Sequence, residues 1–157
     1  MSSVKLNKMI EKLQLVNLVP EVSTDEIEIS SPEINRPALQ LAGYFEHFAS
    51  ERVQIIGYVE YTYLKSLDRD VKLANYEQFL SSDIPCVIYS TRTEPDEDMI
   101  ELAKKYHKPL LSSHRITSDL MAEVIRWLGV ELAVSYTHLR AQETAANLVC
   151  RLLLEKK

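Results

Sequence analysis

A strand, a helix and a second strand follow one another between residues 85 and 112, and this unit constrains the fold more than any other part of the sequence. The run PCVIYS (85–90) is continuously apolar, as expected of a strand buried on both faces of a parallel sheet. The segment TEPDEDMIELAKKYHKP (93–109) predicts a helix, because acidic residues open it and lysines end it, as the helix dipole favours. Thr93 or Glu94 is the expected cap, and Pro95 is expected in the first turn. The run LLSS (110–113) predicts a second strand, so the fold class is α/β.

Further elements are predicted on both sides of this unit. Helical spacing of apolar residues predicts helices over 4–13, over 59–67 and over 70–80; in the second of these, Val59, Tyr63 and Leu67 share one face. Short strands are predicted near 27–29 and 53–56, and SSPEINRP (30–37) is predicted to be a loop. Together they predict a small mixed or parallel sheet with flanking helices. A last helix is expected to start near Thr117 or Ser118 and to bury Met121, Val124, Ile125, Leu128 and Leu132.

Charge and hydropathy exclude several classes of protein. The net charge is −5, and the part before residue 134 carries −7, which disfavours binding to nucleic-acid phosphates. No stretch approaches the roughly 20 apolar residues of a membrane span, and the charged start MSSVKLNKMIEKLQ does not resemble a signal peptide. Cys86 and Cys150 are the only cysteines, too few and too far apart for a disulfide framework or a zinc site. A cytosolic protein without nucleic-acid or membrane partners is expected.

The sequence contains no recognisable pattern of catalytic residues. The chain has three glycines, Gly43, Gly57 and Gly129, and none lies in a GxxxxGK[ST] or GxGxxG phosphate-binding loop. The four histidines (47, 107, 114 and 138) lack the spacing of metal ligands, and the acidic clusters fit helix caps. We therefore expect no catalytic, cofactor-binding or metal-binding residue in this chain.

Two weaker candidate sites remain open. Polar residues follow both predicted strands, and Arg92, Ser112, Ser113 and Arg115 could bind a small anion at the carboxyl edge of the sheet. The alternative is that the hydroxyls cap helices and the arginines are solvated.

The second candidate is an aromatic group that includes Tyr44, Phe45, Tyr58 and Tyr61. Its rings belong either to the core or, if exposed, to a protein interface.

The string INRPALQLAGYFEHFASERVQIIGYVEYTYL (34–64) resembles the amino-terminal domain of the HPr kinase/phosphorylases. The similarity rests on Arg36-Pro37-x-Leu39-x-Leu41-x-Gly43, on the aromatic residues that follow, and on Arg52-Val53-Gln54-x-x-Gly57-x-x-Glu60. The strand–helix–strand unit also looks like a family segment, whereas Ala38 and Thr93 depart from positions where the family often has or tolerates glycine. The resemblance covers residues 1–133.

The resemblance implies a fold similar to the first domain of the Mur ligases MurE and MurF. Family members are bacterial hexamers that phosphorylate a serine of the phosphocarrier protein HPr, using ATP or pyrophosphate, and that reverse the reaction by phosphorolysis. Their phosphate loop, catalytic histidine and magnesium ligands lie in a carboxy-terminal domain, so no catalytic residue carries over to this chain. The resemblance therefore implies a regulatory or assembly fragment; the alternative is a stand-alone anion sensor or protein-interaction domain.

The tail, residues 134–157, does not resemble the family. Its SYTHLRA string is similar to translated sequencing-adapter ends, and its periodicity predicts a helix without biological meaning. We thus expect one family-like domain over 1–133 and a separate tail.

Overall fold

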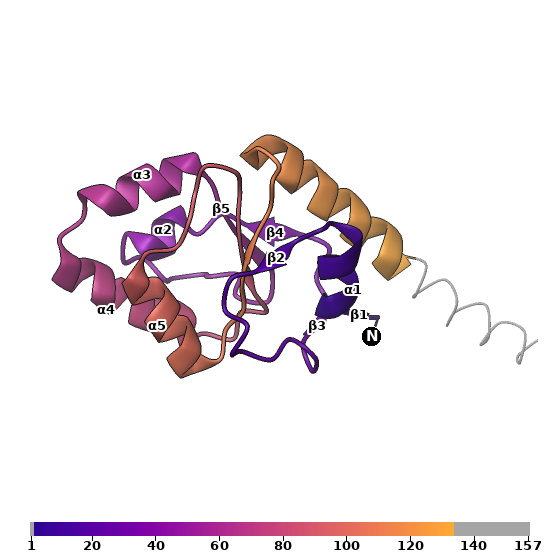
Figure 1. The fold of residues 1–157 in the computed structure, drawn as a ribbon, viewed down its shortest axis with the longest axis horizontal. Helices are drawn as coiled ribbons and strands as arrows, with labels where there is room; N and C mark the ends of the chain where they lie inside the picture. The colour runs from indigo at the N-terminus through magenta and orange to yellow at the C-terminus, as the bar shows by residue number, and fades with distance from the viewer. Residues whose placement is uncertain (1, 134–157) are drawn as a thin grey trace, which may run out of the picture.

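A computed structural model describes residues 2–133, in which a central sheet lies between two layers of helices (Figure 1). The predicted helix in 134–157 lies outside the described residues. After α5 and β7 a last helix occupies residues 117–133, and we call it the closing helix. The other elements, in chain order, are β1 (Val4–Lys5), α1 (Leu6–Lys12), β2 (Val16–Asn17), β3 (Glu28–Ile29), β4 (Ile34–Asn35), α2 (Ala38–Leu41), β5 (Val53–Ile56), α3 (Tyr58–Ser66), α4 (Arg69–Leu80), β6 (Val87–Tyr89), α5 (Glu97–Tyr106) and β7 (Leu110–Ser112).

The main sheet has five strands in the order β2-β7-β6-β5-β4, and all neighbours are parallel except β2 and β7. β1 and β3 form a separate antiparallel pair. The predicted α/β class and the mixed, mostly parallel sheet are therefore confirmed. Within residues 2–133, none of the helices combines the length and the apolar character that a bilayer span requires.

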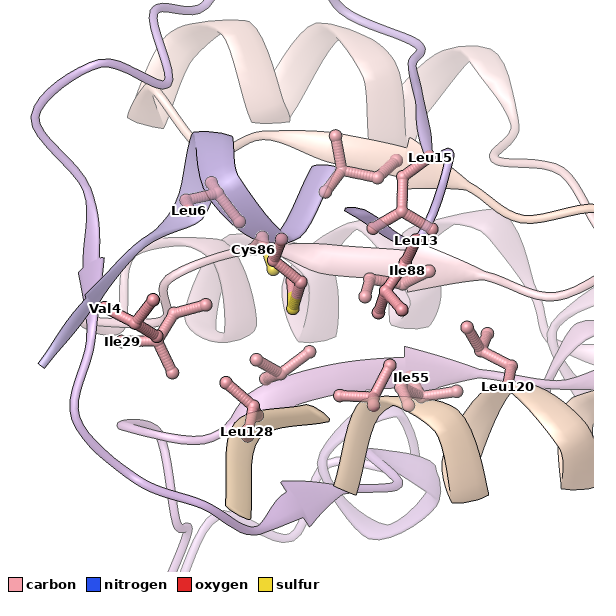
Figure 2. Packing of buried hydrophobic residues seen from close by; sticks show 14 of the residues in the cluster. Val4, Leu6, Leu13, Leu15, Ile29, Ile55, Cys86, Ile88, Leu120 and Leu128 are labelled. Carbon is pink, nitrogen blue, oxygen red and sulfur yellow. The ribbon is translucent and has the colours of Figure 1, made fainter. Parts of the chain in front are cut away.

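Alternation along the strands divides the core into two halves. In and beside β6, Cys86 and Ile88 face α1 and the closing helix, whereas Val87 and Tyr89 face the layer of α2, α3, α4 and α5. Figure 2 shows the first half, in which Ile55, Cys86 and Ile88 from the sheet meet Leu120 and Leu128 from the closing helix. Each central strand is thus buried on both faces, as the continuous apolar run PCVIYS predicts.

The helix α5 forms as predicted but begins later. Its cap is Asp96, whose Oδ1 accepts a hydrogen bond of 2.8 Å from the Met99 amide, so the predicted caps Thr93 and Glu94 and a Pro95 inside the first turn are wrong. Thr93 instead donates its hydroxyl to the Ser90 carbonyl over 2.7 Å and stabilises the turn that leaves β6. An aspartate in this position satisfies an otherwise free amide of the first turn, which a side chain further upstream cannot reach.

Three local predictions, two here and one in the closing helix, differ from the structure. The predicted loop 30–37 contains the edge strand β4, because the extended backbone favoured near its prolines is also strand geometry. The helix face predicted from Val59 and Tyr63 does not turn inward in α3. Val59 is 71% exposed and Tyr63 is exposed, whereas Glu60 and Leu64 are buried.

The closing helix buries Leu120, Val124, Leu128 and Leu132, an i, i+4 row. The predicted Ile125 lies outside this row and is exposed, and Met121 is half-buried.

Complete burial predicts an inert thiol at Cys86. The side chain is fully buried, and burial raises the pKa of the Cys86 thiol to about 12. Because the thiolate is the reactive form, we expect no reaction of Cys86 with Ellman's reagent at pH 8 in native buffer, and full reaction in denaturant. The measurement uses a Cys150→Ser variant, so that one thiol is counted. Rapid stoichiometric labelling in native buffer would contradict this packing.

Candidate functional site

The carboxyl edge of the sheet, where β5, β6 and β7 end, is the position at which open parallel sheets usually bind ligands. That rule depends on a crevice between two strands whose connections run in opposite directions. Here β4, β5, β6 and β7 are neighbours in chain order, and the helices α2 to α5 that connect them all pack on one face of the sheet (Figure 1). The strand order therefore contains no reversal and creates no such crevice.

The predicted anion-binding residues lie at this edge but are not gathered around one cavity. The Arg115 guanidinium donates to the Leu13 carbonyl over 2.7 Å, and the Ser113 hydroxyl accepts a hydrogen bond from the Arg115 amide. Ser112 is half-buried within β7, whereas Arg92 is exposed, with a left-handed backbone at φ 65°. Anion binding by Arg92, Ser112, Ser113 and Arg115 stays a prediction.

A rim cavity of about 260 Å³ opens where the loops after β6 and β7 meet the first turn of α3. The loops are joined by a 2.8 Å hydrogen bond from the Thr91 amide to the Arg115 carbonyl. Tyr58 and Ile116 line the cavity and are 58% and 55% exposed, and Val59 lies beside Tyr58 in the chain. We call Tyr58, Val59 and Ile116 the rim patch. Large apolar side chains that gather at one surface in this way are typical of a protein interface.

A buried ion pair lies beneath the rim patch. The Arg36 guanidinium donates Nε and Nη2 to the two carboxylate oxygens of Glu60, both over 2.5 Å, and Glu60 is 2% exposed. Beside them the hydroxyls of Ser90 and Thr117 are 2.8 Å apart. These polar side chains at the edge of the sheet are thus paired with one another.

Gly57 allows this close packing. A Cβ atom at Gly57 would lie 2.6 Å from Thr117 Cγ2 and 2.8 Å from Arg36 Nη2. Only a residue without a side chain lets the start of α3 approach the start of the closing helix so closely.

Other residues of the sequence motif also have structural roles. Asn35 donates its amide to Gln54 Oε1 over 2.7 Å and to Gln40 Oε1 over 3.2 Å, and Gln54 donates to the Arg52 carbonyl over 2.8 Å. Gln54 is fully buried in the centre of the sheet, where an amide needs such partners. The motif therefore specifies how β4, α2, β5 and α3 pack together.

The predicted aromatic group divides into two parts. Phe45 is half-buried and its ring meets Phe48 edge to face at 5.9 Å, so it belongs to the core beside α2 and α4. Tyr44 is 48% exposed at the end of α2. Tyr58 and Tyr61 lie together on α3 with ring centres 6.2 Å apart.

Sequence reasoning missed Val59 and Ile116 as surface residues. Helical periodicity assigns Val59 to a shared apolar face, and Ile116 lies outside every predicted element. The charged Glu60, placed between Val59 and Leu64, was the available signal that another face turns inward. No group of three metal-ligating side chains comes together anywhere in residues 2–133.

Comparison with known proteins identifies the family. The model of the family described as HPr Serine kinase N terminus matches residues 4–128. The HPr kinase/phosphorylase of Lachnoclostridium phytofermentans is 44% identical over 133 residues, which are 85% of this chain and 43% of that protein. The same enzyme of Alkaliphilus metalliredigens is 38% identical, over 87% of this chain and 44% of the relative, and that of Caldicellulosiruptor bescii is 39% identical, over 84% and 42%.

The chain thus spans less than half the length of these relatives. Among solved structures, the CBS and DRTGG domains of the regulatory region of a Clostridium perfringens pyrophosphatase superpose at a TM-score of 0.48 and 15% identity, over 77% of this chain and 45% of that one, a likeness too slight to indicate function. The match of the family model to residues 4–128 and the identity to these relatives are sufficient to assign the family: the chain belongs to the HPr serine kinase N-terminal family.

Proposed function

We propose that this chain is the non-catalytic, amino-terminal module of a cytosolic HPr kinase/phosphorylase. The observation that carries the proposal is the family match over residues 4–128 in a chain whose three glycines lie outside any phosphate-binding loop pattern. The relatives extend for more than twice the matched length, so phosphoryl transfer from ATP and magnesium to a serine of HPr is assigned to the part of the enzyme that this module does not align with. The module itself has a role in assembly or regulation.

A direct assay tests this division of labour. Incubation of the 157-residue chain with HPr, ATP and Mg²⁺ is expected to leave HPr unphosphorylated above a control without protein, because a triphosphate needs a backbone cradle or clustered cations around it. Phosphate incorporation is followed by mass spectrometry of HPr. A full-length relative serves as the positive control, and turnover by the chain alone would overturn the proposal.

The assembly role is supported by the rim patch. Tyr58, Val59 and Ile116 expose apolar surface at one edge of the sheet, and we assign this surface to contact with a second copy of the chain, in line with the hexamers that the family resemblance implies. Sedimentation velocity at rising protein concentration is expected to show self-association of the chain. The double substitution Tyr58→Ser and Ile116→Ser should abolish it.

A matched control distinguishes self-association through the rim patch from nonspecific hydrophobic association. Val71 on α4 is 49% exposed but does not line the rim cavity, so Val71→Ser should leave self-association unchanged. A chain that stays monomeric at all concentrations would refute the assembly role, whereas the assay with HPr separately tests the proposal that this chain is non-catalytic.

A further inference from the structure

The rim patch is too small to form a whole interface between two copies of the chain. It consists of three exposed side chains, those of Tyr58, Val59 and Ile116. Even a complete aromatic side chain offers at most about 250 Å², so three side chains fall short of the ~800 Å² that each partner buries in a standard interface. The contact must therefore extend onto neighbouring surface. Tyr58 and Val59 belong to α3, which lies at the outer edge of its helical layer (Figure 1).

The outward face of α3 carries no charged side chain. Glu60 and Leu64 turn inward, and the residues on the other side of the helix are exposed; we call them the α3 face, and they are Tyr58, Val59, Thr62, Tyr63 and Ser66. The exposed charge of this helix is Lys65, whose ammonium lies 4.3 Å above the Tyr61 ring on the opposite flank from Val59. The helix α2 packs against α3 and adds the 61% exposed Leu39, in a segment (37–45) without charged residues.

The hydroxyl groups on the α3 face are already bonded within the helix. Thr62 donates its hydroxyl to the Val59 carbonyl over 3.0 Å, and Ser66 donates to the Tyr63 carbonyl over 2.6 Å. Because these polar groups are satisfied by their own backbone, the two side chains present mainly methyl and methylene groups to the outside. Both are also small, so a second helix can approach closely. The α3 face is therefore suited to packing against another helix.

The charge of the molecule indicates what covers this face. Residues 1–133 carry a net charge of −7, so two copies repel each other wherever their charged surfaces meet. The outer faces of α4, α5 and the closing helix all bear charged side chains. The α3 face has none, so a second copy meets no like charge there. A strongly basic partner would instead be attracted to the acidic surfaces and would gain nothing from α3.

We propose that a second copy of the chain packs on the α3 face through a twofold axis that passes beside Thr62. Thr62 lies near the middle of α3 on its exposed side, so it meets the same residue of the second copy, and the two α3 helices run antiparallel. This arrangement sets Tyr58 of one copy against Ser66 of the other, a large side chain against a small one. It also brings opposite ends of the two helix dipoles together. The inference rests on the proposed assembly role and specifies the contact that produces it.

Charged substitutions at Thr62 test the twofold contact, because a residue on the axis meets itself. Thr62→Arg and Thr62→Glu, each alone, should weaken self-association of the 157-residue chain at least tenfold in sedimentation velocity, since each brings like charges together. An equimolar mixture of the two variants should recover at least tenfold, because the charges across the axis are then opposite. Ala122→Arg is the matched control on the exposed side of the closing helix, and it should leave self-association unchanged.

Disulfide formation tests the distance across the axis. With Cys150 replaced by serine, Thr62→Cys should give a covalent dimer under mild oxidation, because Cα atoms beside a twofold axis can lie within the ~7 Å that a disulfide bridges. Ala122→Cys should stay monomeric on a denaturing gel. If the parent chain associates but Thr62→Arg associates equally, or if Thr62→Cys gives no covalent dimer, the copies meet elsewhere: the α3 contact is wrong and the assembly role stands. A parent chain that stays monomeric would overturn the assembly role and this contact with it.

Discussion

Replacing Glu60 by alanine is expected to lower the free energy of unfolding by about 3 kcal/mol, the low end of the roughly 3–5 kcal/mol that breaking a buried ion pair costs. The carboxylate is 2% exposed and accepts two hydrogen bonds from Arg36, so its loss leaves a guanidinium without a counter-charge. The low end applies because the Arg36 side chain is 31% exposed and water can reach part of it. Urea unfolding followed by circular dichroism measures the change.

A double-mutant cycle separates the interaction energy of the Arg36–Glu60 pair from the other contacts of the two side chains. Arg36→Met alone should be about as destabilising as Glu60→Ala, whereas Arg36→Met with Glu60→Leu should recover most of the loss, because no unpaired charge then remains. Glu123→Ala is the control: Glu123 pairs with Arg126 at 2.8 Å on an exposed helix face, and its loss should cost under about 0.5 kcal/mol. Equal effects of Glu60→Ala and Glu123→Ala would show that the buried pair has no special role.

The second large effect is expected from Gly57→Ala, at about 2–3 kcal/mol of destabilisation, as is usual when atoms are forced into a packed core. The new methyl group would lie within 2.8 Å of side-chain atoms of both Thr117 and Arg36, so these side chains have to leave their packed positions. The backbone angle does not cause this effect, because φ at Gly57 is −107°, which alanine adopts easily. Unfolding in urea again gives the magnitude.

Two further variants test the steric explanation. Adding Thr117→Ala to Gly57→Ala removes the nearest clashing atoms and should restore at least about 1 kcal/mol, even though the contact between Thr117 and Ser90 is lost. Gly129 lies on the closing helix with no atom within 4 Å of an added Cβ, so Gly129→Ala should stabilise by about 1 kcal/mol through helix propensity. A Gly57→Ala variant as stable as the parent would contradict the described packing.

The fold could be predicted where local chemistry decides it. The apolar run before Ser90, the acidic start of α5 and its lysine-rich end act over a few residues, and the elements that they predict are present. The inward face of α3 was not predictable in this way, because it depends on Glu60 meeting Arg36, which follows β4 and lies 24 residues earlier in the chain. Periodicity counts Val59 as apolar and therefore as buried, but it cannot register a carboxylate that pairs inside the core.

The candidate sites show the same limit. The sequence places Arg92 and Arg115 after neighbouring strands, and the structure brings their loops together, but the Arg115 side chain turns to the Leu13 carbonyl instead of to an open site. Leu13 lies 102 residues before Arg115 in the chain, so this contact is a property of three-dimensional packing that local sequence patterns cannot register.

The absence of a reversal in the strand order has a consequence for how the chain folds. Helices α2 to α5 each connect consecutive strands and can pack as they are synthesised, but the opposite face of the sheet is covered by α1 and the closing helix, whose Lys8 and Glu131 bond across 123 residues. Contacts of such long range form late. During synthesis on the ribosome, Ile55, Cys86 and Ile88 therefore stay accessible to chaperones until the closing helix has emerged, and shortening the chain at either end would leave this surface open to aggregation.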